Sequence, residues 1–331
     1  MMRIENAIEP EPSNFEILWL RFRSFGAPIL LLSAWLILII ATSLYRPDFI
    51  SYQTLLAVVF TMSIVGVMAI GQSLVTISGG FIDLSQPSGL IFASLVSVKL
   101  SEAGMPFIIV ILGAIITGVI VGSINALIIV LAKLNPIIVT LATNFIGLAV
   151  LYLIFRAAEV PIGSDIHTFG RAYFLGLPAT WWPMFFLILI VGFLIHQTQY
   201  GRQTIAVGGN RYAAQARGIS LKKTRILVFS IAGGFVGFAA ILFCSASGPF
   251  NTASANILQL NVIAAVILAG ISLEGGKGHL WMLFLSVGLL STVPTSLVFF
   301  GLSSDAQAIF QGLILVVAVT IDGYRARKII L

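Results

Sequence analysis

Long apolar stretches follow one another along almost the whole chain and are separated by short polar turns. A membrane-spanning helix needs about 20 mostly apolar residues, and by that measure the pattern predicts about ten spans. They lie near residues 26–45, 53–77, 86–101, 106–131, 137–155, 182–197, 226–246, 258–273, 280–300 and 305–321. We therefore predict an all-α, polytopic transmembrane helix bundle. It forms a single membrane domain over 26–322, with tails at 1–25 and 323–331.

One polar stretch, from Gln72 to Gly89, interrupts this pattern between two apolar segments. It contains Asp83, the pair Gly79-Gly80 and Pro87. Non-helical backbone at membrane depth is tolerated only where protein or a water-filled cavity satisfies its polar groups. We therefore predict a broken helix near 78–89. In the alternative arrangement, the second and third segments form one broken helix plus a re-entrant piece.

A weak internal repeat accompanies this interruption. Ile82 to Ser85, with Gly89, aligns at constant offset with Ile271 to Glu274, with Gly278. Each copy is a polar, glycine-containing break between two apolar segments. Interrupted hydrophobic segments in corresponding positions indicate a transport site at the repeat interface.

Two glycine patterns predict close contact between helices. Gly118 and Gly122 form one GxxxG motif, and Gly233 and Gly237 form another. Small residues at that spacing let backbones approach closely within a bilayer.

Composition supports the membrane assignment. Hydrophobic residues make up 59% of the 331 residues, charged residues only 9%, and the mean hydropathy is +1.07. Soluble domains carry about 25% charged residues. The net charge of +6 is typical of basic cytoplasmic loops and does not indicate nucleic-acid binding.

The distribution of positive charge predicts the orientation. With the N-terminus inside and the spans alternating, every Lys and Arg except Arg46, Lys99, Arg156 and Arg171 falls on the inner side. This is the asymmetry of the positive-inside rule. We expect both termini to be cytoplasmic.

Polar side chains within the apolar segments are the candidates for a solute path, because such residues face the bundle interior or a water-filled cavity. They are Gln72, Thr76, Asp83, Ser85, Asn125, Thr140, Asn144 and Asn261. Few are charged, which favours a neutral or hydroxyl-rich solute. Structural alternatives are hydrogen bonds between helices and, for Asp83, capping of the following helix.

Motifs for enzymatic chemistry are absent from the sequence. It contains no G-x-x-x-x-G-K-[ST] phosphate loop, no HExxH, no cysteine pair and no G-x-S-x-G elbow. The single cysteine, Cys244, lies in an apolar segment. We therefore expect no catalytic residues, no metal and no cofactor in this chain.

The most charged stretch, 199–225, requires a separate explanation. Residues 211–217 are good helix formers, Asn210 is a possible N-cap and Gly218 a possible C′ glycine. A short, exposed amphipathic helix is a suitable docking element. The alternative is a basic tether that only sets topology.

Five stretches in order resemble the permease subunits of ATP-binding-cassette importers of the ribose/xylose/galactose type. They are GQSLVTISGGFIDLS from Gly71, KLNPIIVTL from Lys133, YGRQTIAVGGNRYAAQARGIS from Tyr200, LQLNVIAAVILAGISLEGGKG from Leu258 and FQGLILVVAVTIDGYRAR from Phe310. The chain departs from the family at Gln86-Pro87-Ser88-Gly89, where a small Val-Gly-Ser run is common. It also has Arg217 where serine is frequent. These departures leave the solute unassigned.

The resemblance implies a sugar importer in the bacterial inner membrane, with a second permease copy or a related permease. It also implies a periplasmic solute-binding protein and a cytoplasmic ATPase with two cassettes, which binds ATP and Mg. That ATPase would dock on the coupling segment at Gly209, Asn210, Ala213, Ala214, Gly218 and Ile219. Two other classes stay open on the residues alone. One is an ion-coupled secondary transporter of a small polar solute, and the other is a membrane scaffold or embedded enzyme.

Overall fold

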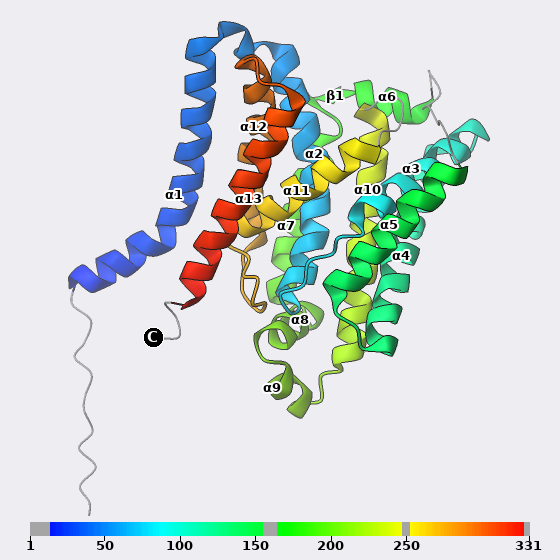
Figure 1. Cartoon of the computed structure of the whole chain (residues 1–331), viewed down its shortest axis with the longest axis vertical. Helices are drawn as coiled ribbons and strands as arrows, with labels where there is room; N and C mark the ends of the chain where they lie inside the picture. Colours follow the sequence, from blue (N-terminus) through cyan, green and yellow to red (C-terminus); the bar gives the residue numbers. More distant parts are fainter. Residues whose placement is uncertain (1–13, 155–163, 247–251, 328–331) are drawn as a thin grey trace, which may run out of the picture.

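The computed structural model describes residues 14–154, 164–246 and 252–327 (Figure 1). Its helices are α1 (Asn14–Tyr45), α2 (Tyr52–Ile77), α3 (Gln86–Glu102), α4 (Phe107–Ala132), α5 (Pro136–Ile154), α6 (Asp165–Arg171), α7 (Trp181–Gln197), α8 (Gln199–Gly209), α9 (Arg211–Ala216), α10 (Leu221–Ala246), α11 (Thr252–Leu268), α12 (Leu283–Phe299) and α13 (Ser304–Arg327). Short 3-10 turns, η1 (Pro47–Ile50) and η2 (Leu280–Met282), precede α2 and α12. The strands β1 (Tyr173–Phe174) and β2 (Leu177–Pro178) pair antiparallel.

Each predicted apolar segment forms a helix, so the all-α bundle is confirmed, but the count of about ten spans is not. Among the described residues, 6 helices are long and apolar enough to cross a membrane, or 7 if α7 and α8, bent by 74°, count as one. The helices α3, α7 and α11 have 17 residues each. At 1.5 Å per residue, 17 residues span about 26 Å, which is less than the ~30 Å hydrocarbon core.

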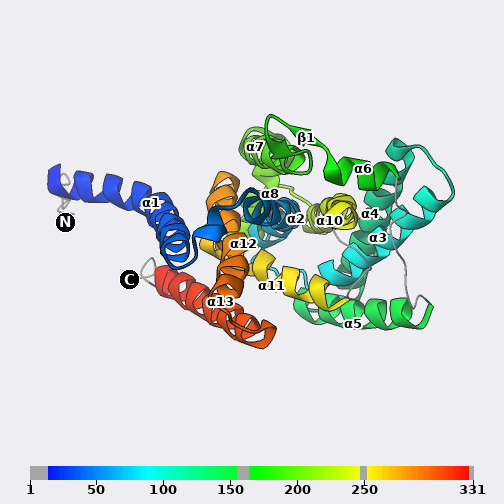
Figure 2. The ribbon, with the colours of Figure 1, turned by 90° about the horizontal axis from the view of Figure 1, so that it is seen from above.

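Helices α2 and α10 form the centre of the bundle, and the other helices surround them (Figures 1 and 2). The lower half of α2 is completely buried, from Met62 to Ile77. Helix α1 lies at the edge, where it packs on α12, and its first part bends away from the bundle (Figure 1). It contains Pro28. Proline removes a backbone hydrogen bond inside a helix and so produces such a bend.

The two GxxxG motifs pack against each other, as predicted. A Cβ atom on Gly118 would overlap the carbonyl oxygen of Gly233, and one on Gly237 would overlap that of Ala114. Helices α4 and α10 therefore touch backbone to backbone, which gives them the most extensive contact in the fold.

The predicted interruption of the helix near 78–89 is confirmed, with a correction to its end. Helix α2 stops at Ile77 and α3 begins at Gln86. Residues 78–85 between them are not helical, and we call this segment the break. The last part of the predicted range is already helical because Pro87 occupies the first turn, where its missing N–H has no helical partner to lose.

The two members of the predicted repeat lie side by side. The loop at 269–279 follows α11 and approaches the break so closely that a Cβ atom on Gly80 would overlap the carbonyl oxygen of Leu273. A small apolar cluster centred on Ile263 and Ile267 includes Ile82 and Leu84 of the break. The two interruptions therefore share one packing unit, and the repeat itself remains a prediction.

The beginning of α1 and the end of α13 lie at the same end of the bundle as α8 and α9 (Figure 1). The α6 helix and the β1–β2 hairpin lie at the opposite end. This arrangement fits an even number of crossings. Helix α1 begins at Asn14, within the predicted tail 1–25, and α13 continues to Arg327, within the predicted tail 323–331, so the tails remain predictions. Residues 1–13 and 328–331 lie outside the described part.

Candidate functional site

Two side chains of α2 hold the first part of the break. Gln72 Nε2 donates to the carbonyl of Phe81 at 3.3 Å, and Thr76 Oγ1 donates to the same oxygen at 3.0 Å. The backbone N–H of Asp83 donates to Gln72 Oε1 at 3.2 Å. These bonds replace the helical hydrogen bonds that the extended backbone loses, as a buried, non-helical segment requires.

The Asp83 carboxylate stabilises the turn that leads into α3. Its Oδ1 accepts hydrogen bonds from Ser85 N, at 2.9 Å, and from Ser85 Oγ. Asn125 Nδ2 of α4 donates to Ser85 Oγ at 2.7 Å. Asp83 is only 2% exposed. Its role here is close to the predicted capping function, although Ser85 itself is the N-cap residue of α3.

Side chains from α5 and α11 complete this network. Thr140 Oγ1 accepts from Leu84 N at 3.0 Å, and Asn144 Oδ1 accepts from Ser88 N at 3.0 Å. Gln259 Nε2 donates to the carbonyl of Asp83 at 3.0 Å. Gln259 was not among the residues predicted from the sequence, although a polar residue between Leu258 and Leu260 was a signal that could have identified it.

All the predicted path residues except Asn261 therefore meet in one buried set, which we call the break network. It consists of Gln72, Thr76, Asp83, Ser85, Asn125, Thr140 and Asn144, together with Gln259. Their polar atoms mainly bond to one another and to the backbone of the break. This arrangement favours support of the broken helix over direct contact with a solute.

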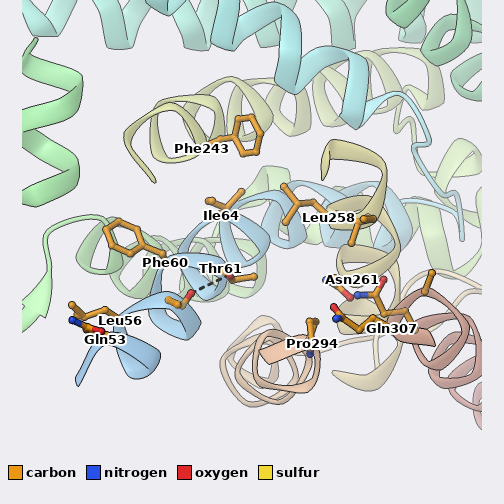
Figure 3. Close-up of a pocket in the computed structure, with 14 residues that line it drawn as sticks. Gln53, Leu56, Phe60, Thr61, Ile64, Phe243, Leu258, Asn261, Pro294 and Gln307 are labelled. Atoms are coloured by element: carbon orange, nitrogen blue, oxygen red, sulfur yellow. Dashed lines mark hydrogen bonds between the residues drawn. The ribbon is translucent and has the colours of Figure 1, made fainter. Parts of the chain in front are cut away.

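Asn261 lies elsewhere, in a cavity of about 700 Å³ between α2, α10, α11, α12 and α13 (Figure 3). We call it the upper cavity. It is lined by Gln53, Leu56, Ala57, Phe60, Thr61, Ile64, Phe243, Ile257, Leu258, Asn261, Pro294, Gln307, Ala308 and Gln311. The α2 part of this lining comes from the first turns of that helix, which lie at the end of the bundle opposite α9 (Figure 1).

Helix α9 confirms the local structure predicted for the coupling segment. Asn210 is its N-cap, because Oδ1 accepts from Tyr212 N at 3.1 Å and from Ala213 N at 3.0 Å. Gly218 follows the helix with φ of +78°, as a C′ glycine does. The structure adds α8, which was not predicted and which ends at Gly208 and Gly209.

The side chains of α9 do not all face outward. Ala213 is exposed, whereas Ala214 is only 3% exposed and packs inside. Gly218 is exposed and Ile219 is half-buried, with its N–H bonded to Ala214 O at 3.1 Å. Tyr212, which was not among the predicted residues, is 72% exposed. Exposed tyrosines are typical anchors of protein interfaces.

Three glycine pairs meet where α8 approaches the break, and we call this contact the glycine junction. The pairs are Gly79-Gly80, Gly208-Gly209 and Gly275-Gly276. A Cβ atom on Gly208 would overlap the carbonyl oxygen of Ile77 and lie 2.6 Å from Gly276 N. Gly276 N donates to Ile77 O at 2.8 Å. The backbones of the break, of α8 and of the loop after α11 are therefore in direct contact.

A second cavity, of about 440 Å³, opens beside the glycine junction. Its lining includes Asn210, Tyr212, Arg225 and Glu274, and the Arg225 guanidinium lies 4.7 Å from the centre of the Phe81 ring. Within the described residues, no group of three or more His, Cys, Asp or Glu side chains is arranged to hold a metal ion.

Comparison with known proteins identifies the family. The family model for the permease component of the branched-chain amino acid transport system matches residues 54–319. The chain is 33% identical over 291 residues to the ribose import permease protein RbsC of Bacillus subtilis, covering 86% of this chain and 89% of the relative. It is 30% identical over 298 residues to the L-arabinose transport system permease protein AraH of Escherichia coli, covering 90% of each. No solved structure shows a significant match. The chain therefore belongs to this family of transport-system permeases, as its resemblance to the permease subunits of ATP-binding-cassette importers predicted.

Proposed function

We propose that this chain forms the membrane path of an ATP-driven importer of a neutral monosaccharide in the bacterial inner membrane. It works with a second permease copy or a related permease, and with a two-cassette ATPase that binds ATP and Mg at the α8–α9 end. A solute-binding protein delivers the sugar at the opposite end. The relatives named for ribose and L-arabinose support a sugar as the solute.

A sugar suits the upper cavity better than the amino acid in the family's description. An amino acid carries an ammonium and a carboxylate, and removing both from water is costly unless each meets an opposite charge. None of the described residues that line the upper cavity is charged. Its amides can both donate and accept hydrogen bonds, as sugar hydroxyls require.

One observation supports the ATP-driven mechanism, namely the position of α9 relative to the glycine junction. Helix α9 exposes Tyr212 and Ala213, and only Asn210 separates it from α8. The end of α8 contacts the backbone of Ile77 and of Gly276 without intervening side chains. A displacement of α9 by the ATPase would therefore act directly on the end of α2 and on the loop after α11. Packed backbones transmit such shifts because they deform little.

The test replaces one exposed alanine at each end of the molecule. Ala213→Glu adds a charged side chain to the exposed face of α9, and Ala103→Glu makes the same change at the exposed turn after α3. We expect Ala213→Glu to insert normally but to lose the co-purifying ATPase and ATP-driven sugar uptake. Ala103→Glu should keep the ATPase. An Ala213→Glu variant that retains ATPase and uptake would contradict docking on α9, and uptake that persists without ATP would contradict the mechanism itself.

A further inference from the structure

The upper cavity differs from the break network in how its polar groups are satisfied. In the break network every member makes a hydrogen bond, although Gln259 Oε1 is left without a partner. The Asn261 side chain, 4% exposed, makes no hydrogen bond to another described residue. The Gln311 side chain is 6% exposed, and its buried Oε1 has no hydrogen-bond partner among the described residues. Buried polar atoms are nearly always paired, so each exception requires an explanation such as a missing ligand.

Further polar groups face the same space. Gln307 Nε2 donates to Leu302 O at 3.2 Å, and Thr61 Oγ1 donates to Ala57 O at 3.1 Å. Both bonds use a donor and leave the side-chain oxygen as an acceptor. The Phe60 and Phe243 rings add apolar surface to the cavity (Figure 3). Small-molecule sites typically combine such apolar walls with a few convergent polar groups, in volumes of about 300–1,000 Å³.

We propose that the upper cavity is the outer sugar-binding station of this permease, and that Asn261 and Gln311 are its hydrogen-bonding contacts. This inference rests on the proposed function and adds the place and the residues of solute contact. Amides suit a neutral polyol, because each hydroxyl both donates and accepts. The aromatic and aliphatic wall suits the C–H face of a sugar ring.

The location of the cavity also links it to the glycine junction. Asn261 lies on α11, whose end continues into the loop that carries Gly275-Gly276, and Thr61 lies on α2, whose last residue is Ile77. Of the helices that line the cavity, α2 therefore ends at the junction, and α11 is connected to it by the loop that follows Leu268. Sugar binding and ATPase docking would act on the same two helices from opposite ends, which provides the differential contacts that a switch between two states needs.

The experiment is thiol labelling in membranes that contain the intact transporter, in a Cys244→Ala background. Asn261→Cys places a thiol in the upper cavity, and Leu260→Cys places one on the neighbouring, outward side of α11, which does not line the cavity. Only the thiolate reacts, so a cationic methanethiosulfonate added from outside reacts where the thiol meets water. Gln311→Cys repeats the test from α13 if the first variant does not assemble.

We expect the introduced thiol at position 261 to react, and that at 260 to stay unmodified. Saturating D-ribose or L-arabinose, or another sugar of a pentose and hexose panel, should slow the reaction at 261 at least fivefold, and L-leucine should not. Gln311→Met should lower uptake of the same sugar about five- to tenfold, since one hydrogen bond contributes ~1 kcal/mol.

The outcomes separate this inference from the proposed function. ATP-driven sugar uptake without protection at 261 or 311, and without loss of uptake in Gln311→Met, overturns the binding station and leaves the proposed function intact. Absence of ATP-driven uptake for every sugar of the panel overturns both. Protection by L-leucine instead of a sugar overturns the chemical class that we assign.

Discussion

Substitution of Gly208 by alanine tests the glycine junction directly. The new Cβ would lie 2.6 Å from Gly276 N and would overlap Ile77 O, whereas ordinary contact begins at 3.4 Å. The backbones must therefore separate by at least 0.8 Å, the difference between those two distances. The added Cβ would lie against both the donor and the acceptor of the 2.8 Å hydrogen bond from Gly276 N to Ile77 O, and we expect it to wedge this bond open.

The cost follows from these two effects. Overpacking of a tight contact costs about 1–3 kcal/mol, and the lost hydrogen bond about 1 kcal/mol more. We expect a total of about 2–4 kcal/mol, which corresponds to a decrease in Tm of about 4–8 °C at ~2 °C per kcal/mol. Sugar uptake driven by ATP should decrease further than the loss of folded protein explains, because the junction also connects α8 to α2.

The assay is thermal unfolding of the purified protein in detergent together with uptake in membranes. Gly209→Ala is the matched control for stability, since a Cβ there meets nothing within 4 Å. Gly312→Ala on α13, where a Cβ also meets nothing within 4 Å, is the control for uptake. A Gly208→Ala protein with unchanged Tm and unchanged uptake would refute the close backbone contact and the route of coupling built on it.

Two other predictions concern helix packing and the break. Gly233→Ala should lower the Tm more than Gly234→Ala. A Cβ atom on Gly233 would overlap the carbonyl oxygen of Gly118, whereas a Cβ atom on Gly234 would meet only side chains, at 3.2 Å and beyond. Equal effects in thermal unfolding would argue against the α4–α10 contact. Asp83→Ala should reduce uptake strongly while the protein still inserts, because Ser85 loses the acceptor of two hydrogen bonds, and Asp83→Asn should retain most uptake because its amide oxygen can accept them. An Asn variant as impaired as the Ala variant would show instead that the negative charge is needed.

The sequence by itself determined the apolar helices and several helix ends. Apolar runs long enough for a bilayer become helices whatever surrounds them, because the backbone has no other way to satisfy its polar groups there. Local rules were also sufficient for Asn210 as an N-cap, for Gly218 as a C′ glycine and for the end of α2 near Gly79-Gly80. These features depend on residues that are neighbours in the chain. The family resemblance likewise rests on continuous stretches of sequence.

The tertiary structure decided what the polar residues do. The sequence marks both Asp83 and Asn261 as intramembrane polar residues. Asp83 is hydrogen-bonded by Gln72 of α2, by Gln259 of α11 and by Ser85 of its own turn. Asn261 lines a cavity without a partner among the described residues. The glycine junction likewise joins segments that are far apart in the sequence, Gly80, Gly208 and Gly276. Hydrogen-bond satisfaction and backbone contact are relations between distant parts of the chain, so only the packed bundle establishes which polar groups support the fold and which are left for a solute.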